Sequence, residues 1–441
     1  MILLPLLWSW VRADIDTVLN DPALKGATVS VCVRDLEGNA VYERNPDLLM
    51  TPGSNQKLLT ALFALSALGP DYVVSTRIWK QKDRIIVDSP GDPSMTKEIL
   101  VRARMALGIS GALDVYVQQA YRPGVPPSWE LDDLPNKYAA PITAFTVDRG
   151  SFEVWAEDGK VSIPSRAYGI RLKVTEGSGK PVVEYSPFTG LINVQGQIPR
   201  TKTRLDTLAI ARPDAAASWF LAGNFHETAD LPTTPADVVI TSRSLGNIVS
   251  ECLTVSDNNF AEHLLLMAAL KAGPLGKDPY ALAAKRETSF LTGTVGLSST
   301  AFRITDGSGV SRHNLVTPRA ITDLLIWASR QPFATLFREG LASPGRGTLK
   351  SRLSGIDFRG KTGTLDLVSA LSGYVKTKSG KELVVSIMFN QCAAPLEVQH
   401  QIQDKIIEDL SGNGTIHAFV PNYAPRASFS SLGLAAVDRI R

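Results

Sequence analysis

The sequence predicts a mixed α/β fold of the α+β kind, interrupted by a largely β inserted region. Three observations lead to this expectation. Segments near both ends of the chain alternate apolar and polar residues, as half-buried strands do. Long apolar stretches with a helical period accompany these strands. The middle, residues 140–210, consists of short alternating segments separated by turn residues. The simplest architecture is one α/β domain made from both ends of the chain.

The length and composition limit the classes of protein that fit. A chain of 441 residues is too long for one compact core and indicates two or three domains. The formal charge of +3 comes from scattered basic residues with no Lys/Arg stripe, so we expect no nucleic-acid partner. The three cysteines, Cys32, Cys252 and Cys392, are far apart and form no C-x-x-C pair. We therefore expect neither a disulfide framework nor a metal site.

Residues 1–13, MILLPLLWSWVRA, read as a secretory signal peptide. The apolar run is too short to span a bilayer, and Val11-Arg12-Ala13 resembles a small-x-small cleavage site. The pattern lacks a Lys or Arg ahead of the apolar run. An ordinary buried N-terminal helix is the alternative that this short run leaves open.

The elements follow in order along the chain. A hairpin is expected at 27–44 around Glu37-Gly38-Asn39, followed by an apolar helix after Pro52-Gly53 and a strand at 73–80. The middle begins with an amphipathic helix at 96–107 and ends with a helix at 214–223. Helices return from 242 onward. Residues 358–390 read as two or three antiparallel strands turning at Ser379-Gly380, and a last amphipathic helix covers 396–410.

The stretch TPGSNQKLLTALFALSALG, residues 51–69, contains the first candidate site residues. Ser54 and Lys57 are three residues apart, so a helix places them on one face. The helix start favours developing negative charge near Ser54. The apolar run after Lys57 predicts a buried helix, and desolvation favours a neutral amine. A neutral Lys57 can take the proton of a nucleophilic Ser54.

S-x-x-K alone is weak, since a second copy occurs at Ser94 and Lys97. That copy opens an amphipathic helix with arginines, so its lysine should be solvated and charged. We interpret it as a chance match.

Two further motifs support the interpretation of Ser54 and Lys57 as site residues. Ser256-Asp257-Asn258 lies between two helical stretches, where a hydroxyl and a carboxamide can face one site. Lys361-Thr362-Gly363-Thr364 begins a strand along which a ligand backbone can lie, because Gly363 has no side chain. Lys361 and Thr362 can bind a carboxylate, and the N–H groups of Thr364 and Ser54 can form an oxyanion hole. Taken singly, each motif also fits a helix cap, a turn or a solvated charge.

The order S-x-x-K, S-x-N, K-T-G is that of the serine penicillin-recognising enzymes. The chain resembles the class C low-molecular-mass penicillin-binding proteins, the D-alanyl-D-alanine carboxypeptidase/endopeptidase family. The long gap from Ser54 to Ser256, the segment DGSGVSRHN at 306–314 and the segment PGDPS at 90–94 support the resemblance.

The resemblance implies a penicillin-binding/β-lactamase-type transpeptidase domain, with a five-stranded antiparallel sheet between helices. Its segments would be 14–80 and 236–441, with an inserted domain II at 81–140 and 205–235 and a β-rich domain III at 141–204. Ser54 would be the acylated nucleophile, Lys57 its base, and Ser256 the proton donor to the leaving amine. The substrate would be bound by Asn258, Lys361, Thr362, Gly363 and Thr364.

The resemblance also implies an exported enzyme, periplasmic or extracellular, that acts on peptidoglycan D-Ala-D-Ala peptides and is acylated by β-lactams. It implies no cofactor and no metal, and it leaves open a weak association with the membrane or cell wall. The insertion is shorter than the family suggests, and Asn55 stands where the family often has Thr.

Other functions remain as alternatives. A β-lactamase or esterase uses the same triplet, but a Glu-x-x-Leu-Asn loop is absent; the nearest segment, ELDDLPN at 130–136, has the wrong spacing. No G-x-S-x-G or H-E-x-x-H motif occurs, which disfavours a Ser-His-Asp hydrolase and a metalloprotease. A non-catalytic cell-wall-binding protein of the same fold stays open, although every reacting group is present.

Overall fold

The two ends of the chain combine into one five-stranded antiparallel sheet. In the computed structural model, which describes residues 14–163 and 169–412, the strand order is β16-β17-β18-β1-β2. The strands are β1 (Thr28–Asp35), β2 (Ala40–Arg44), β16 (Phe358–Leu365), β17 (Val368–Lys376) and β18 (Glu382–Asn390). β1 pairs along its length with β18, which joins the N-terminal hairpin to the C-terminal strands. The signal peptide predicted at 1–13 lies outside the described residues.

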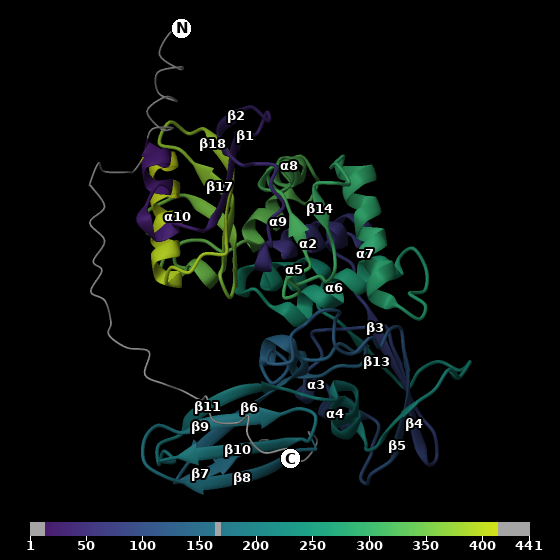
Figure 1. Cartoon of the computed structure of the whole chain (residues 1–441). Helices are drawn as coiled ribbons and strands as arrows, with labels where there is room; N and C mark the ends of the chain where they lie inside the picture. Colours follow the sequence, from purple (N-terminus) through teal and green to yellow (C-terminus); the bar gives the residue numbers. More distant parts are fainter. Residues whose placement is uncertain (1–13, 164–168, 413–441) are drawn as a thin grey trace, which may run out of the picture.

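Helices cover both faces of this sheet (Figure 1). On one face lie α10 (Leu396–Ser411) and the helical residues 14–19. The other face carries a group of mostly apolar helices: α2 (Gln56–Leu68), α5 (Leu245–Val255), α6 (Asn258–Leu270), α7 (Pro279–Phe290), α8 (Pro318–Ala328) and α9 (Ala334–Gly340). Alternate residues of β17 enter the two cores, Leu371 on the α10 side and Ala370 on the other. The predicted fold class, an antiparallel sheet between helices, is confirmed.

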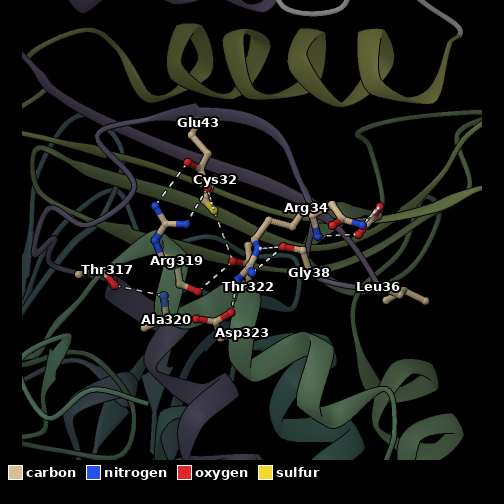
Figure 2. Close-up of polar contacts among 12 residues, drawn as sticks. Cys32, Arg34, Leu36, Gly38, Glu43, Thr317, Arg319, Ala320, Thr322 and Asp323 are labelled. Carbon is tan, nitrogen blue, oxygen red and sulfur yellow. Dashed lines mark hydrogen bonds and ion pairs between the residues drawn. The ribbon is translucent and has the colours of Figure 1, made fainter. Parts of the chain in front are cut away.

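Polar contacts fix α8 against the first two strands (Figure 2). The Sγ of Cys32 on β1 lies 3.4 Å from Oγ1 of Thr322 on α8, inside the buried face. At the helix start, Arg319 donates to the carboxylate of Glu43 on β2 at 2.7 Å. Burial raises the pKa of the Cys32 thiol to about 11, so this cysteine acts as a small neutral side chain.

The inserted region forms the lower lobe in Figure 1 and is largely β, as expected. One sheet has the order β12-β5-β4-β3-β13, and two three-stranded sheets have the orders β8-β10-β9 and β11-β6-β7. Two helices accompany them, α3 (Lys97–Ala106) and α4 (Pro213–Leu221). The strands are β3 (Ser75–Lys80), β4 (Arg84–Ser89), β5 (Asp114–Gln119), β6 (Ser151–Glu157), β7 (Lys160–Ser162), β8 (Arg171–Glu176), β9 (Val182–Ser186), β10 (Leu191–Gly196), β11 (Thr203–Ala209), β12 (Phe225–Glu227) and β13 (Val238–Thr241).

The pairing of β3 with β13 bears on the domain boundaries. These two strands form one edge of the first sheet of the inserted region. From the sequence, residues 75–80 and 238–241 were instead assigned to the transpeptidase domain. Similarly, β11 begins at Thr203 and pairs with β6, which lies within the stretch assigned to domain III. We propose that the insertion begins before β3 and ends after β13. Among the described helices, none has the length and apolar character needed to cross a membrane.

Candidate active site

Ser54 lies in a 3₁₀ turn, Gly53–Asn55, immediately before α2. The sequence predicted a helix start at this serine; the regular α-helix begins two residues later, at Gln56. The first ten residues of α2 are buried, and the Lys57 side chain has no exposed surface. The turn therefore leaves Ser54 half-buried at the rim while its neighbouring lysine lies inside the protein.

Glycines allow strand β16 to approach the turn that carries Ser54. A Cβ on Gly363 would lie 2.5 Å from the carbonyl oxygen of Pro52 and 3.1 Å from the nitrogen of Ser54. A Cβ on Gly53, whose φ is +51°, would lie 3.1 Å from the nitrogen of Thr364. Only residues without a side chain fit this contact. The contact brings the backbone nitrogens of Ser54 and Thr364 to one edge, where we expected an oxyanion hole.

The amine of Lys57 contacts three oxygen atoms. Its Nζ lies 3.0 Å from Oγ of Ser54, 2.7 Å from Oδ1 of Asn258 and 2.7 Å from the carbonyl oxygen of Ser308. A neutral amine has two N–H donors and one lone pair. It can therefore donate to Asn258 and Ser308 and accept the hydroxyl proton of Ser54.

Burial lowers the pKa of Lys57, and nearby carboxylates, among them Asp306 and Glu262, oppose part of this shift. Glu262 itself is fully buried, and burial together with the charge of Asp306 raises its pKa to about 8. Its two oxygens accept the N–H groups of Gly307 and Ser308 at 3.0 Å and 2.8 Å. Ser308 thus connects the two groups: its N–H donates to Glu262, and its carbonyl oxygen accepts from Lys57.

Ser256 and Asn258 lie where α5 ends and α6 begins: Ser256 caps the end of α5, and Asn258 is the first residue of α6. Ser256 ends α5 in the left-handed region, with φ of 64°, and its Oγ accepts a hydrogen bond from Nζ of Lys361 at 2.8 Å. Asn258 donates through Nδ2 to the carbonyl oxygen of Tyr138 at 2.9 Å. Its Oδ1 faces Lys57, a contact that the sequence did not indicate.

Lys361 and Thr362 lie within β16 rather than at its first residue. The Lys361 side chain is fully buried, and burial and then the charge of Lys57 lower its pKa well below the ordinary value. The hydroxyl of Thr362 donates to Oγ1 of Thr348 at 2.9 Å. The structure therefore brings all eight predicted site residues into one region, around two serines that each contact a buried lysine.

A cavity of about 560 Å³ opens onto this region, and Ser54, Ser256, Asn258 and Thr364 line it. Its mouth carries several charged side chains: Glu130, Asp132, Asp133, Arg312 and Asp366. Arg312 pairs with Glu130 at 3.3 Å. The segment ELDDLPN thus lies beside the site, although it lacks the spacing of a β-lactamase loop.

The second S-x-x-K copy is built differently. Lys97 is only partly buried, with 42% of its side chain exposed, and it lies 3.7 Å from Glu98, while the hydroxyl of Ser94 donates to Asp92. Ser94 and Lys97 therefore do not share the buried contact that joins Ser54 to Lys57. Within residues 14–163 and 169–412, no group of three His, Cys, Asp or Glu side chains is placed to hold a metal ion.

Three contributors to the site were not identified from the sequence. They are Glu262, the carbonyl group of Tyr138 and Arg149, which reaches the loop of Ser256 from the inserted region. Glu262 could have been identified from the sequence, because it is an acidic residue inside the apolar run NNFAEHLLLMAAL, residues 258–270. The sequence gives no indication of the role of the Tyr138 carbonyl, because every residue has a backbone carbonyl group.

Comparisons with known proteins identify the family and the fold of the chain. Residues 11–410 match the D-Ala-D-Ala carboxypeptidase 3 (S13) family. A D-alanyl-D-alanine carboxypeptidase from Actinomadura sp. is 30% identical over 90% of this chain and 84% of its own length. The fold resembles the crystal structure of penicillin-binding protein 4 from Haemophilus influenzae, with a TM-score of 0.77, 19% identity, and coverage of 90% of this chain and 99% of that one. A complex of that protein with a β-lactam gives a TM-score of 0.72 at 20% identity, with the same coverage.

Proposed function

The chain belongs to the D-Ala-D-Ala carboxypeptidase 3 (S13) family, and we propose that it cleaves peptidoglycan stem peptides with Ser54 as the nucleophile. It is a serine-type D-Ala-D-Ala carboxypeptidase, and each residue role below is our assignment. The observation that carries the assignment is the 3.0 Å contact between Oγ of Ser54 and Nζ of a fully buried Lys57.

The first half of the reaction forms an acyl-enzyme. Oγ of Ser54 attacks the carbonyl carbon of the D-Ala-D-Ala bond while neutral Lys57 takes the hydroxyl proton. The backbone N–H groups of Ser54 and Thr364 stabilise the resulting oxyanion. The C–N bond then breaks, and Ser256 delivers a proton to the leaving amine of D-alanine. The contact from Lys361 orients the Ser256 hydroxyl for this step.

The second half restores the enzyme. Water attacks the ester carbon and gives up a proton, which restores the hydroxyl of Ser256. The bond to Oγ of Ser54 then breaks, and this serine recovers its proton from Lys57. The terminal carboxylate of the substrate lies against Lys361 and Thr362, and the substrate backbone runs along Gly363. If the leaving amine belongs to a cross-linked neighbouring stem, the same steps describe an endopeptidase.

Asn258 has two tasks in this proposal. Its Oδ1 accepts one N–H of Lys57, which directs the amine lone pair toward Ser54. Its Nδ2 also lies at the cavity, where it can donate to the acyl-side amide of a substrate. The charged mouth around Glu130 and Arg312 suits a peptide that carries charges of its own.

A β-lactam fits the same proposal, because its ring amide can acylate Ser54 while the leaving amine stays tethered. We also propose that the chain is exported and works in the periplasm or outside the cell, where its peptidoglycan substrate lies. No metal or organic cofactor takes part in the proposed steps.

The test is the intact mass after incubation with benzylpenicillin, for the wild type and for Ser54→Ala. A stable adduct of one drug mass, absent in Ser54→Ala, supports the proposal. Ser94→Ala is the matched control, since it removes the serine of the other S-x-x-K copy, and it should keep the adduct. Rapid turnover of the drug without an adduct favours a β-lactamase. A folded wild type without adduct or turnover favours the non-catalytic wall-binding protein.

A further inference from the structure

A left-handed turn in the inserted region points a guanidinium at the active-site loop. The turn comprises Asp148, Arg149 and Gly150, whose φ angles are +49°, +57° and +67°. Residues other than glycine avoid this conformation, and each pays a steric cost when adopting it. Two such residues in succession are therefore unusual and require support from their surroundings.

Contacts on both sides hold the turn in place. The N–H of Asp148 donates to the carbonyl of Met95 at 3.0 Å, and the carboxylate of Asp148 accepts the N–H of Lys97 at 3.1 Å. The carbonyl of Gly150 accepts the N–H of Ile210 at 2.7 Å. These backbone contacts all come from the inserted region.

The Arg149 side chain bridges the two helices that flank Ser256. It donates to Asp257 at 3.0 Å and to Glu251 on α5. Its guanidinium also lies over the ring of Phe260 on α6, 4.6 Å from the ring centre. Asp257 is the central residue of the Ser256-Asp257-Asn258 loop and caps α6 by accepting the N–H of Phe260 at 2.9 Å.

We propose that Arg149 is a positioning residue, supplied by the inserted region, that sets Ser256 and Asn258 for catalysis. Ser256 adopts a left-handed conformation between the two acidic partners of Arg149, so a change in either helix end moves its hydroxyl. The planar guanidinium contacts both carboxylates at once, which a point charge does less well. The carbonyl of Tyr138, also from the inserted region, holds Asn258 from the other side.

This inference rests on the proposed function, and three substitutions separate positioning from simple stabilisation. Arg149→Met removes the guanidinium and keeps the unfavourable backbone. Arg149→Gly removes the guanidinium and relieves the backbone, because glycine accepts the left-handed region. Arg149→Lys keeps the positive charge but lacks the planar guanidinium that contacts both carboxylates. Arg204→Met is the matched control, since it breaks an exposed arginine pair with Glu153 in the same inserted region.

The measurements are the rate of Ser54 acylation by benzylpenicillin, the kcat and KM for D-Ala release, and the melting temperature. We expect Arg149→Met and Arg149→Gly to slow acylation by about 10- to 100-fold and to lower kcat more than KM, as misplaced catalytic groups do. Arg149→Gly should melt at a higher temperature than Arg149→Met yet be equally slow. Arg149→Lys should recover part of the rate, and Arg204→Met should match the wild type.

Amide hydrogen exchange of residues 256–260 tests the inference without a measurement of enzyme activity. Faster exchange there in Arg149→Gly, with unchanged exchange in β17, supports the inference. Wild-type acylation and wild-type exchange in Arg149→Gly would overturn it, as would rates that follow the melting temperature alone. If the proposed function is wrong, the wild type itself forms no adduct. In that case the hydrogen-exchange measurement alone tests the inference about Arg149.

Discussion

The contact between β16 and the Ser54 turn gives a prediction whose size follows from the coordinates. In Gly363→Ala, the new Cβ would lie 2.5 Å from the carbonyl oxygen of Pro52, whereas ordinary contacts begin at 3.4 Å. The strand and the turn must therefore separate by about 0.9 Å, the difference between these values. Both neighbours are backbone, so no flexible side chain can absorb the change.

The separation should affect catalysis more than stability. Overpacking of this kind costs about 1–3 kcal/mol in the free energy of unfolding. The same movement displaces the N–H of Ser54 relative to that of Thr364, and losing one oxyanion donor lowers rates by about 10²- to 10³-fold. We expect Ser54 acylation by benzylpenicillin to slow by about 100-fold, with a moderately lower melting temperature.

The assay is the second-order rate of adduct formation, followed by intact mass. Gly111→Ala is the control, because a Cβ on Gly111 meets nothing within 4 Å and its backbone is not in the left-handed region. It should react at the wild-type rate. Acylation of Gly363→Ala at the wild-type rate would show that the spacing between the turn and β16 does not set the oxyanion hole.

Three further predictions concern Lys57, Ser256 and His263. Burial lowers the pKa of Lys57, so wild-type acylation should fall, as acid protonates the amine, at a lower pH than an ordinary lysine would give. Lys57→Arg, which cannot lose its proton, should form no adduct between pH 5 and 9. An adduct in this variant would refute the lysine base. Ser256→Ala should lower kcat for D-Ala release by about 10²- to 10⁴-fold, and a wild-type kcat would assign the proton donor elsewhere. Burial lowers the pKa of His263 from 6.5 to about 3, so below pH 6.5 the unfolded chain binds a proton that the folded chain does not. Stability should therefore fall as the pH drops from 6.5 toward 3. The melting temperature of the wild type should decline more steeply between pH 7 and 5 than that of His263→Gln, and equal slopes would contradict the assignment.

Local patterns predicted most of the elements but not how they pair. The hairpin at 27–44 and the helix at 396–410 were expected because their apolar residues follow periods of two and 3.6. The pairing of β3 with β13 was not expected, because the two strands lie far apart in the sequence, at 75–80 and 238–241. Sequence separation hides such pairing, since alternation shows which face of a strand is buried and not which strand lies beside it.

The sequence indicated the candidate site through a polar residue in an otherwise apolar segment. Lys57 is a charge in a buried apolar helix, and that conflict drew attention to Ser54. Glu262 contradicts the apolar run of α6 in the same way, and the same reasoning applied there would have found it. Arg149 gave no such signal, because Asp-Arg-Gly reads as an ordinary turn. Its left-handed backbone depends on tertiary contacts with Met95 and Ile210.

The position of Glu262 suits the proposed role of Lys57 as a base. Among the described residues, neither Lys57 nor Lys361 forms an ion pair with a carboxylate. A carboxylate in direct contact with Lys57 would favour the charged amine and remove the base. Glu262 instead holds the N–H of Ser308, whose carbonyl contacts the amine. Ser308 therefore holds the amine through its carbonyl group, while Glu262, whose charge would favour a protonated amine, has no direct contact with it.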